Sequence, residues 1–122
     1  VLRGLAKNNY SLGLVTSGAR SLVHPIIEKL GWCRLFSVVV CGDDVRRAKP
    51  SPDIYLAAVD RSAVPGSQLI VVEDSENGVR AAVMAGLRVV GCARLGNEKE
   101  LCRAGATVCI GSLNELSQVL GD

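Results

Sequence analysis

The sequence predicts an α/β fold in which a parallel sheet lies between two layers of helices. Short apolar runs alternate with stretches whose apolar residues recur at helical spacing, as in successive βαβ units. Hydrophobic residues make up 48% of the 122 residues but aromatic residues only 3%. Val, Leu, Ile and Ala must therefore fill the core, as in strands that are buried on both faces. Polar clusters follow three of the apolar runs, at the sheet edge where such folds bind ligands.

The first half of the chain predicts three helices and two strands. Residues 1–5 have the apolar pattern of a helix interior, so we expect the chain to begin within a truncated helix. Strands are expected over residues 12–15 and 36–41, with a helix between them whose apolar residues span 22–30. Ser51 is expected to cap the next helix. The buried stripe of that helix is expected to comprise Ile54, Tyr55, Ala58 and Val59.

The second half continues the alternation. The expected elements are a strand over 69–72, a helix over 79–85, a strand over 89–92, a helix over 98–103 and a strand over 107–110. Ser112 and Glu115 have the spacing of a capping box and predict the start of a last helix. Without a repeat or a linker, residues 1–122 are interpreted as a single α/β portion with right-handed crossovers.

Charge, hydropathy and cysteine usage indicate which partners and sites are not expected. The net charge is +2 and the basic residues are scattered, so nucleic acid is not an expected partner. No apolar run reaches the length of a membrane span. The five cysteines are odd in number and form no C-x-x-C pair. We therefore expect buried reduced thiols in the cytosol or an organelle, rather than a zinc site or a disulfide framework.

Two of the polar clusters carry chemistry suited to phosphate. Thr16, Ser17 and Gly18 lie between a predicted strand and a predicted helix, where a hydroxyl and backbone N–H groups can hold phosphate oxygens. The alternative is an ordinary helix N-cap. Lys49 lies just before a capped helix, within the sequence AKPSPD, where its ammonium could neutralise a phosphoryl group or a carboxylate. The alternative is a solvated surface lysine.

The third cluster is an adjacent pair of carboxylates, Glu73 and Asp74, at the end of a buried strand. Such a pair is costly unless a positive charge lies nearby. Mg²⁺ is the natural candidate, because it binds hard oxygen ligands and links carboxylates to substrate phosphates. The alternative is that both residues cap the next helix. Taken together, the three clusters predict Mg²⁺-assisted phosphoryl transfer.

The same three segments resemble the haloacid dehalogenase superfamily, and more narrowly its β-phosphoglucomutase-like phosphatases and phosphomutases. The segments are LVTSG at residues 14–18, AKPSPD at 48–53 and VEDSENG at 72–78. The resemblance covers nearly the whole chain. It implies a three-layer Rossmann-like core and a small phosphorylated substrate of the sugar phosphate kind. It leaves open the choice between phosphatase and phosphomutase, and the oligomeric state.

The resemblance also implies a role for each matching residue. Thr16 corresponds to the hydroxyl that holds a phosphoryl oxygen, with the amide of Ser17 beside it. Lys49 corresponds to the lysine that bridges the phosphoryl group and a nucleophilic aspartate. Asp74 corresponds to the direct Mg²⁺ ligand, and Glu73 to a neighbour that acts directly or through water.

The chain departs from the family pattern in one large respect. The family begins with a strand that ends in Asp-x-Asp, followed by a substrate-selecting cap domain, whereas no Asp-x-Asp occurs in these 122 residues. The resemblance therefore implies that residues 1–122 are the C-terminal portion of an incomplete core. Its first strand, which lies mid-sheet between the strands ending at residues 16 and 72, is missing. We expect two unpaired strand edges, marginal stability and no turnover by this chain alone. A non-enzymatic binding module remains the alternative, and a nucleotide-binding domain ranks last because G-x-G-x-x-G is absent.

Overall fold

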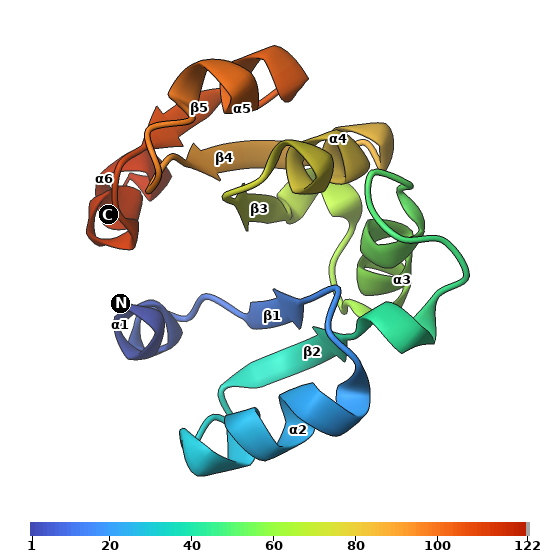
Figure 1. The fold of residues 1–122 in the computed structure, drawn as a ribbon. Helices are drawn as coiled ribbons and strands as arrows, with labels where there is room; N and C mark the ends of the chain where they lie inside the picture. Colours follow the sequence, from blue (N-terminus) through green and yellow to red (C-terminus); the bar gives the residue numbers. More distant parts are fainter. Residues whose placement is uncertain (122) are drawn as a thin grey trace.

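The computed structural model describes residues 1–121 and has the α/β order expected from the sequence (Figure 1). The helices are α1 (Leu2–Lys7), α2 (Arg20–Lys29), α3 (Asp53–Arg61), α4 (Glu76–Met84), α5 (Glu98–Ala104) and α6 (Leu116–Leu120). The strands are β1 (Leu12–Val15), β2 (Phe36–Val40), β3 (Ile70–Glu73), β4 (Arg88–Cys92) and β5 (Val108–Ile110). Within this range, none of the helices combines the length and the apolar character needed to cross a membrane.

The strands form two separate parallel sheets. β1 pairs with β2, and a second sheet has the order β3-β4-β5. Over the described residues β1 and β3 share no hydrogen-bonded ladder, and the two sheets lie as distinct halves of the molecule (Figure 1). This is the break that the resemblance implied, because the absent central strand belongs between these two edges.

The helix α3 joins the two halves, because it packs against β1, β2 and α4. The main core gathers buried side chains of β2, α3, α4 and α5, among them Val40, Ile54, Val79 and Leu101. Complete burial of such a side chain contributes about 2 kcal/mol. This shared core holds the sheets in place although their strands do not meet.

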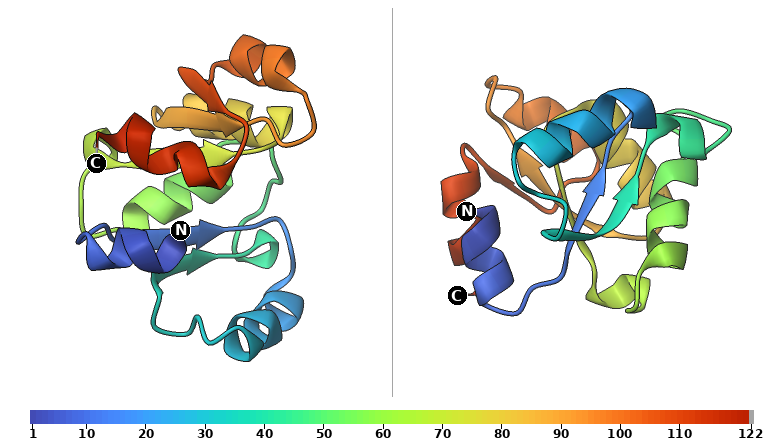
Figure 2. Two further views of the ribbon diagram at one scale, coloured as in Figure 1. Left: turned by 90° about the vertical axis from the view of Figure 1, so that its left-hand side faces the viewer. Right: turned by 90° about the horizontal axis from the view of Figure 1, so that it is seen from below.

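A second core lies on the opposite face of the β3-β4-β5 sheet and completes three layers. It contains Leu5 of α1, Val90 of β4, Ile110 of β5 and Leu116 of α6. The first and last helices therefore lie together, and Figure 2 shows the two ends of the described chain close to each other. The fold thus has helices on both faces of its parallel strands, as expected.

Two residues predicted to cap helices, Ser51 and Ser112, do not directly precede those helices in the structure. The residue before α3 is Pro52, and Ser51 Oγ accepts a long hydrogen bond of 3.4 Å from the Asp53 amide. Ser112 caps a 3-10 turn at Leu113–Glu115. α6 therefore begins only at Leu116, because the tighter turn uses the predicted cap.

The predicted apolar face of α2 is only partly covered. Ile27 is 8% exposed, whereas Leu22, Ile26 and Leu30 are 69%, 56% and 47% exposed. Helical spacing places these residues on one side of the helix, with Ile27 at one edge of that side and Leu22 at the other. The part of this side that carries Leu22 and Ile26 is therefore open to solvent.

Candidate active site

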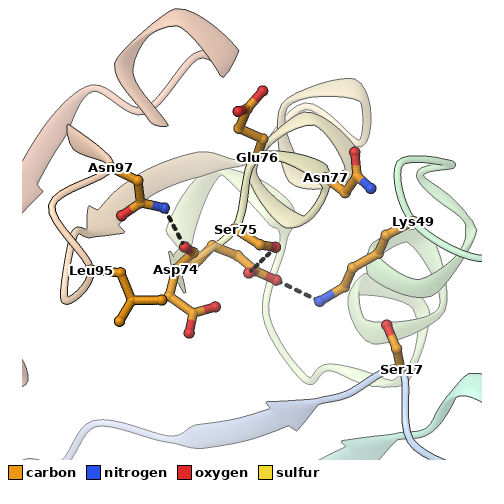
Figure 3. A pocket seen from close by; sticks show the side chains of 9 residues that line it. Ser17, Lys49, Asp74, Ser75, Glu76, Asn77, Leu95 and Asn97 are labelled. Atoms are coloured by element: carbon orange, nitrogen blue, oxygen red, sulfur yellow. Dashed lines mark hydrogen bonds and ion pairs between the residues drawn. The ribbon is translucent and has the colours of Figure 1, made fainter. Parts of the chain in front are cut away.

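All five predicted site residues line two clefts that share much of their walls, at the carboxyl ends of β1 and β3. The larger cleft has a volume of about 840 Å³ (Figure 3). It is lined by Ser17, Lys49, Glu73, Asp74, Ser75, Glu76, Asn77, Leu95 and Asn97. The smaller cleft, of about 330 Å³, adds Thr16 and is also lined by Ser17, Lys49, Glu73 and Asp74. The structure thus brings together three segments that are far apart in the sequence.

The buried carboxylate of Glu73 is the most densely bonded group of the site. Lys49 Nζ and the Tyr55 hydroxyl both donate to Glu73 Oε1 at 2.5 Å. Ser75 Oγ donates to Oε2 at 3.4 Å. The Lys49 and Glu73 side chains are 13% and 7% exposed, so this ion pair is largely withdrawn from water. A buried charge is tolerated only when it is paired and hydrogen-bonded in this way.

Tyr55 takes part in this network as a neutral donor. Burial, and then the charge of Glu73, raise the pKa of Tyr55 above its usual value, so the hydroxyl keeps its proton near neutral pH. The sequence predicted Tyr55 only as part of the buried stripe of α3. No local pattern reveals the hydroxyl's role, because Glu73 lies 18 residues further along the chain.

Gly78 leaves the space that the Glu73 carboxylate occupies. It lies in the first turn of α4, where its amide donates to Ser75 Oγ at 3.1 Å and Ser75 caps the helix. A Cβ atom at this position would lie 2.1 Å from the carboxyl carbon of Glu73. The carboxylate therefore packs against bare helix backbone, which requires glycine here.

Asp74 has the opposite environment, since it is exposed at the mouth of the cleft. Among residues 1–121 its carboxylate makes no hydrogen bond or ion pair, while its backbone carbonyl accepts from Asn97 Nδ2 at 3.0 Å. Asn97 Oδ1 is buried without a hydrogen-bond partner in the same region. A free carboxylate beside an unpaired amide oxygen fits Mg²⁺, which prefers such hard ligands. In the described range, however, no three His, Cys, Asp or Glu side chains converge as a metal site.

The turn after β1 combines features of a local cap and of a phosphate-holding turn. Thr16 Oγ1 accepts a hydrogen bond of 3.1 Å from the Gly18 amide, so its oxygen caps the local turn while its hydroxyl hydrogen stays available to an acceptor. Ser17 is exposed and lines both clefts. Gly42 packs against the turn, and its amide donates to Gly18 O at 2.9 Å. A Cβ at Gly42 would lie 2.2 Å from Ser17 O, so this close approach requires glycine.

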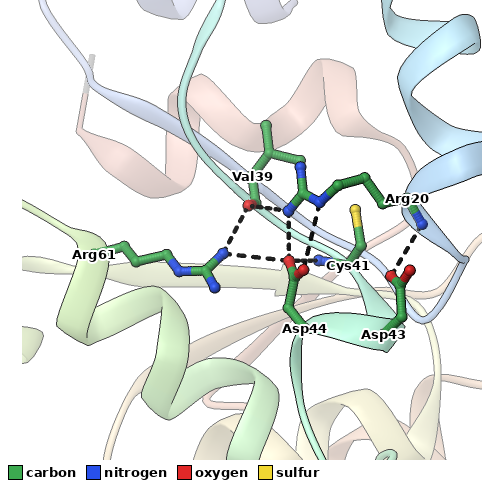
Figure 4. Close-up of polar contacts among 6 residues, drawn as sticks. All are labelled: Arg20, Val39, Cys41, Asp43, Asp44 and Arg61. Atoms are coloured by element: carbon green, nitrogen blue, oxygen red, sulfur yellow. Dashed lines mark hydrogen bonds and ion pairs between the residues drawn. The ribbon is translucent and has the colours of Figure 1, made fainter.

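A charged cluster behind this turn ties three elements together (Figure 4). Arg20, at the start of α2, pairs with Asp44 at 2.5 Å, and Arg61, at the end of α3, pairs with the same oxygen at 3.2 Å. The Cys41 amide also donates to it at 2.8 Å. The hydrogen bond from Arg20 has the largest effect, and together these bonds hold the pKa of Asp44 well below its usual value. The sequence singled out neither Arg61 nor this pairing, because the partners are 24 and 17 residues apart.

Comparison with known proteins supports the family that the motifs suggested. Residues 1–92 match the model of the haloacid dehalogenase-like hydrolases. The phosphoglycolate phosphatase of Escherichia coli K12 is 40% identical over 90 residues, which are 74% of this chain and 36% of that protein. The Salmonella paratyphi A phosphoglycolate phosphatase is 36% identical over 121 residues, covering 98% and 48%. The chain therefore spans less than half the length of these relatives.

Solved structures agree with this comparison. A protein assigned as a β-phosphoglucomutase from Thermotoga maritima superposes with a TM-score of 0.89 at 33% identity, covering 98% of this chain and 56% of that one. Rhodobacter sphaeroides CbbY, in complex with xylulose-(1,5)-bisphosphate, superposes with a TM-score of 0.81 at 32% identity, covering 94% and 52%. The fold and motifs of this chain, together with these relatives, show that the chain belongs to the haloacid dehalogenase-like hydrolases.

Proposed function

We propose that this chain supplies the phosphate-holding and metal-holding side of a site for Mg²⁺-dependent phosphoryl transfer. The observation that carries the proposal is the Lys49–Glu73 pair in a cleft beside the unpaired Asp74 carboxylate and Ser17. The fixed ammonium of Lys49 suits a phosphoryl group, and the free carboxylate of Asp74 suits a divalent cation. The phosphatase relatives support this class of reaction.

Each residue has a distinct proposed role. Thr16 and the Ser17 amide hold phosphoryl oxygens, and Lys49 neutralises charge on the transferred group. Asp74 binds Mg²⁺ directly, and Glu73 contributes through Oε2, whose one bond is the long contact with Ser75. When bound, the cation would neutralise charge on the phosphoryl oxygens. In the whole protein, the family resemblance implies transfer through an aspartyl-phosphate on an aspartate outside this sequence.

The proposed substrate is a small phosphorylated metabolite. Phosphoglycolate phosphatases among the relatives and the xylulose bisphosphate complex of CbbY support this class. The exposed Leu95, 87% accessible at the rim of the cleft, offers an apolar contact beside the charged floor. The cap domain that would choose among such metabolites is not part of this sequence.

A catalytically inactive binding module is the second candidate. The observation that favours it is that, among residues 1–121, no third acidic, His or Cys side chain joins Glu73 and Asp74 to complete a metal site. The two candidates differ in what the parent protein does. A parent sequence with an Asp-x-Asp segment after an apolar strand would favour the enzyme.

The proposal is tested by assaying phosphate release from phosphoglycolate and sugar phosphates. The parent protein should turn over with Mg²⁺, and Lys49→Ala should reduce kcat by about 100-fold or more. Lys29→Ala, an exposed lysine on α2, is the matched control and should retain activity. The 122-residue chain alone should show negligible turnover. Robust Mg²⁺-dependent hydrolysis by this chain, or an unaffected Lys49→Ala parent, would contradict the proposal.

A further inference from the structure

Two cysteines outside the phosphate site lie in contact. Cys102 belongs to α5 and Cys109 to β5, and their Sγ atoms are 3.2 Å apart. Cys102 is exposed and Cys109 is half-buried. A disulfide bond needs a separation of about 2.0 Å between the sulfurs, so these atoms must approach each other by about 1.2 Å to bond. The other exposed cysteine, Cys33, has no such neighbour among the described residues.

The surroundings hold Cys109 in this position. A Cβ at Gly91, on the neighbouring strand, would lie 3.0 Å from Cys109 Sγ, so the glycine provides room for the sulfur. Burial, and then the hydrogen bond with Cys102, raise the pKa of Cys109 to about 11. Cys109 therefore stays a thiol near neutral pH. Cys102, the exposed member, is the sulfur that a reagent in solvent meets first.

We propose that Cys102 and Cys109 form a reversible dithiol site that reacts with small aliphatic disulfides such as oxidised glutathione. The Cys102 thiolate attacks one glutathione sulfur, forming a mixed disulfide and releasing one glutathione thiolate, which takes up a proton. Cys109 then loses its proton to solvent, and its thiolate attacks Cys102 Sγ. The second glutathione leaves and is protonated. Two protein thiols are oxidised to one disulfide, and one oxidised glutathione is reduced to two thiols.

The bond would fasten α5 to β5 and so constrain the segment that leads to the active-site cleft. Asn97 directly precedes α5, and its side chain donates to the Asp74 carbonyl. Oxidation would thus fasten the last turn of α5, which carries Cys102, and would remove the weak bond of 3.9 Å that Cys109 Sγ donates to the Glu98 carbonyl in the first turn. The proposal concerns the chemistry of the two thiols and is independent of phosphoryl transfer by the protein.

The experiment equilibrates the folded 122-residue chain with oxidised and reduced glutathione, blocks the remaining thiols and maps the peptides by mass spectrometry. Folding is verified by circular dichroism in the same buffer, which contains a stabilising osmolyte. Trypsin cleaves after Arg103, so Cys102 and Cys109 fall in separate peptides, 100–103 and 104–122. We expect these two peptides joined, with the mass of two hydrogen atoms lost, and separated again by reductant.

Two controls make the result specific to the folded geometry. Cys33→Ser should leave the joined peptides unchanged, while in the natural chain Cys33 should carry a glutathione adduct. The same exchange in concentrated urea should give a yield of joined peptides about tenfold lower, because the unfolded chain does not hold the sulfurs together. Separate glutathione adducts or free thiols at Cys102 and Cys109, or an equal yield in urea, would overturn the proposal.

Discussion

Glu73 keeps a buried carboxylate because its two oxygens are bonded and a glycine leaves room for them. Lys49 and Tyr55 share one oxygen, Ser75 contacts the other, and Gly78 presents no side chain. Loss of one partner from such a buried pair typically costs about 3–5 kcal/mol. The carboxylate thus fixes the position of the Lys49 ammonium in the cleft, which makes Glu73 a positioning residue as well as a proposed contributor to the metal site.

Gly78→Ala tests this packing at the residue scale. Alanine is ordinarily favoured over glycine in a helix by about 1 kcal/mol. Here its Cβ would lie 2.1 Å from the Glu73 carboxyl carbon, and Glu73 can move away only by leaving Lys49 and Tyr55. We expect a net destabilisation of about 2 kcal/mol, measured by urea unfolding.

Gly4→Ala is the matched control for this substitution. Gly4 lies in α1, and no atom lies within 4 Å of a Cβ built at that position. The control should therefore gain a few tenths to about 1 kcal/mol. A stabilised Gly78→Ala chain would show that Glu73 is not held where the structure places it.

The sequence revealed the charged residues of the site better than the neutral ones. Glu73 and Asp74, like Thr16 and Ser17, directly follow predicted strands, so the parallel topology predicted that they would meet, whereas Lys49 was predicted only to precede a helix. Tyr55 fits helical periodicity as a core residue, and this pattern gives no sign of its hydroxyl's partner. The different environments of Glu73 and Asp74 depend on alternation along β3, where one side chain turns inward and the next outward, and on the space left by Gly78.

At the scale of the elements, the charged cluster of Arg20, Asp44 and Arg61 connects the start of α2, the end of β2 and the end of α3. Arg20 also donates its backbone amide to Asp43 at 3.0 Å, so both acidic residues hold the beginning of α2. That helix directly follows the Thr16–Ser17–Gly18 turn. The cluster therefore contributes to the position of the turn without touching the cleft.

The low pKa of Asp44 predicts how stability changes with acid. The folded-state pKa lies below the unfolded value of about 4, so the unfolded chain binds more protons in the interval between them. The contribution of Asp44 is fully present above the unfolded pKa and is lost as pH falls toward the folded pKa. Urea unfolding should show the free energy of unfolding falling below about pH 5.

Asp44→Asn should lower stability at pH 7 and flatten this acid dependence. Asp60→Asn, at an exposed position of α3, serves as the control and should follow the natural chain at every pH. Identical acid profiles for Asp44→Asn and the natural chain would contradict the role given to the cluster.

The predicted elements were confirmed where periodicity and turn residues acted together, as for β4 and α5. Periodicity also predicted α2, but it identifies an apolar side of a helix and not how much of that side other elements cover. Leu22 and Ile26 are exposed although they belong to that side. Helix starts shifted where a proline or a 3-10 turn altered the first turn, which capping patterns alone do not resolve.

At the scale of the whole molecule, the main feature is a sheet divided between β1 and β3. Each of these strands has one edge without a ladder, and the two halves are joined through α3 and the shared core. We expect a free energy of unfolding at or below the lower end of the usual range, about 5 kcal/mol. Urea unfolding measures it, and a value near 10 kcal/mol would contradict this expectation.

Hydrogen exchange should reveal the same division. Amides of β4, which is paired on both sides, should exchange more slowly than amides of β1 and β2, which form the isolated pair. Local opening of a two-stranded sheet requires less free energy than opening of the larger core. Equal protection of β1 and β4 would indicate that the two halves open as one unit.

The central claim is that Asp74 binds the cation that phosphoryl transfer requires. The most direct measurement is the Mg²⁺ dependence of phosphate release by the parent protein, compared between the natural sequence, Asp74→Ala and the exposed control Asp60→Ala. We predict that Asp74→Ala loses about 100-fold or more in kcat/KM at Mg²⁺ levels that saturate the other two proteins. An Asp74→Ala protein with unimpaired activity and unchanged Mg²⁺ dependence would contradict the account.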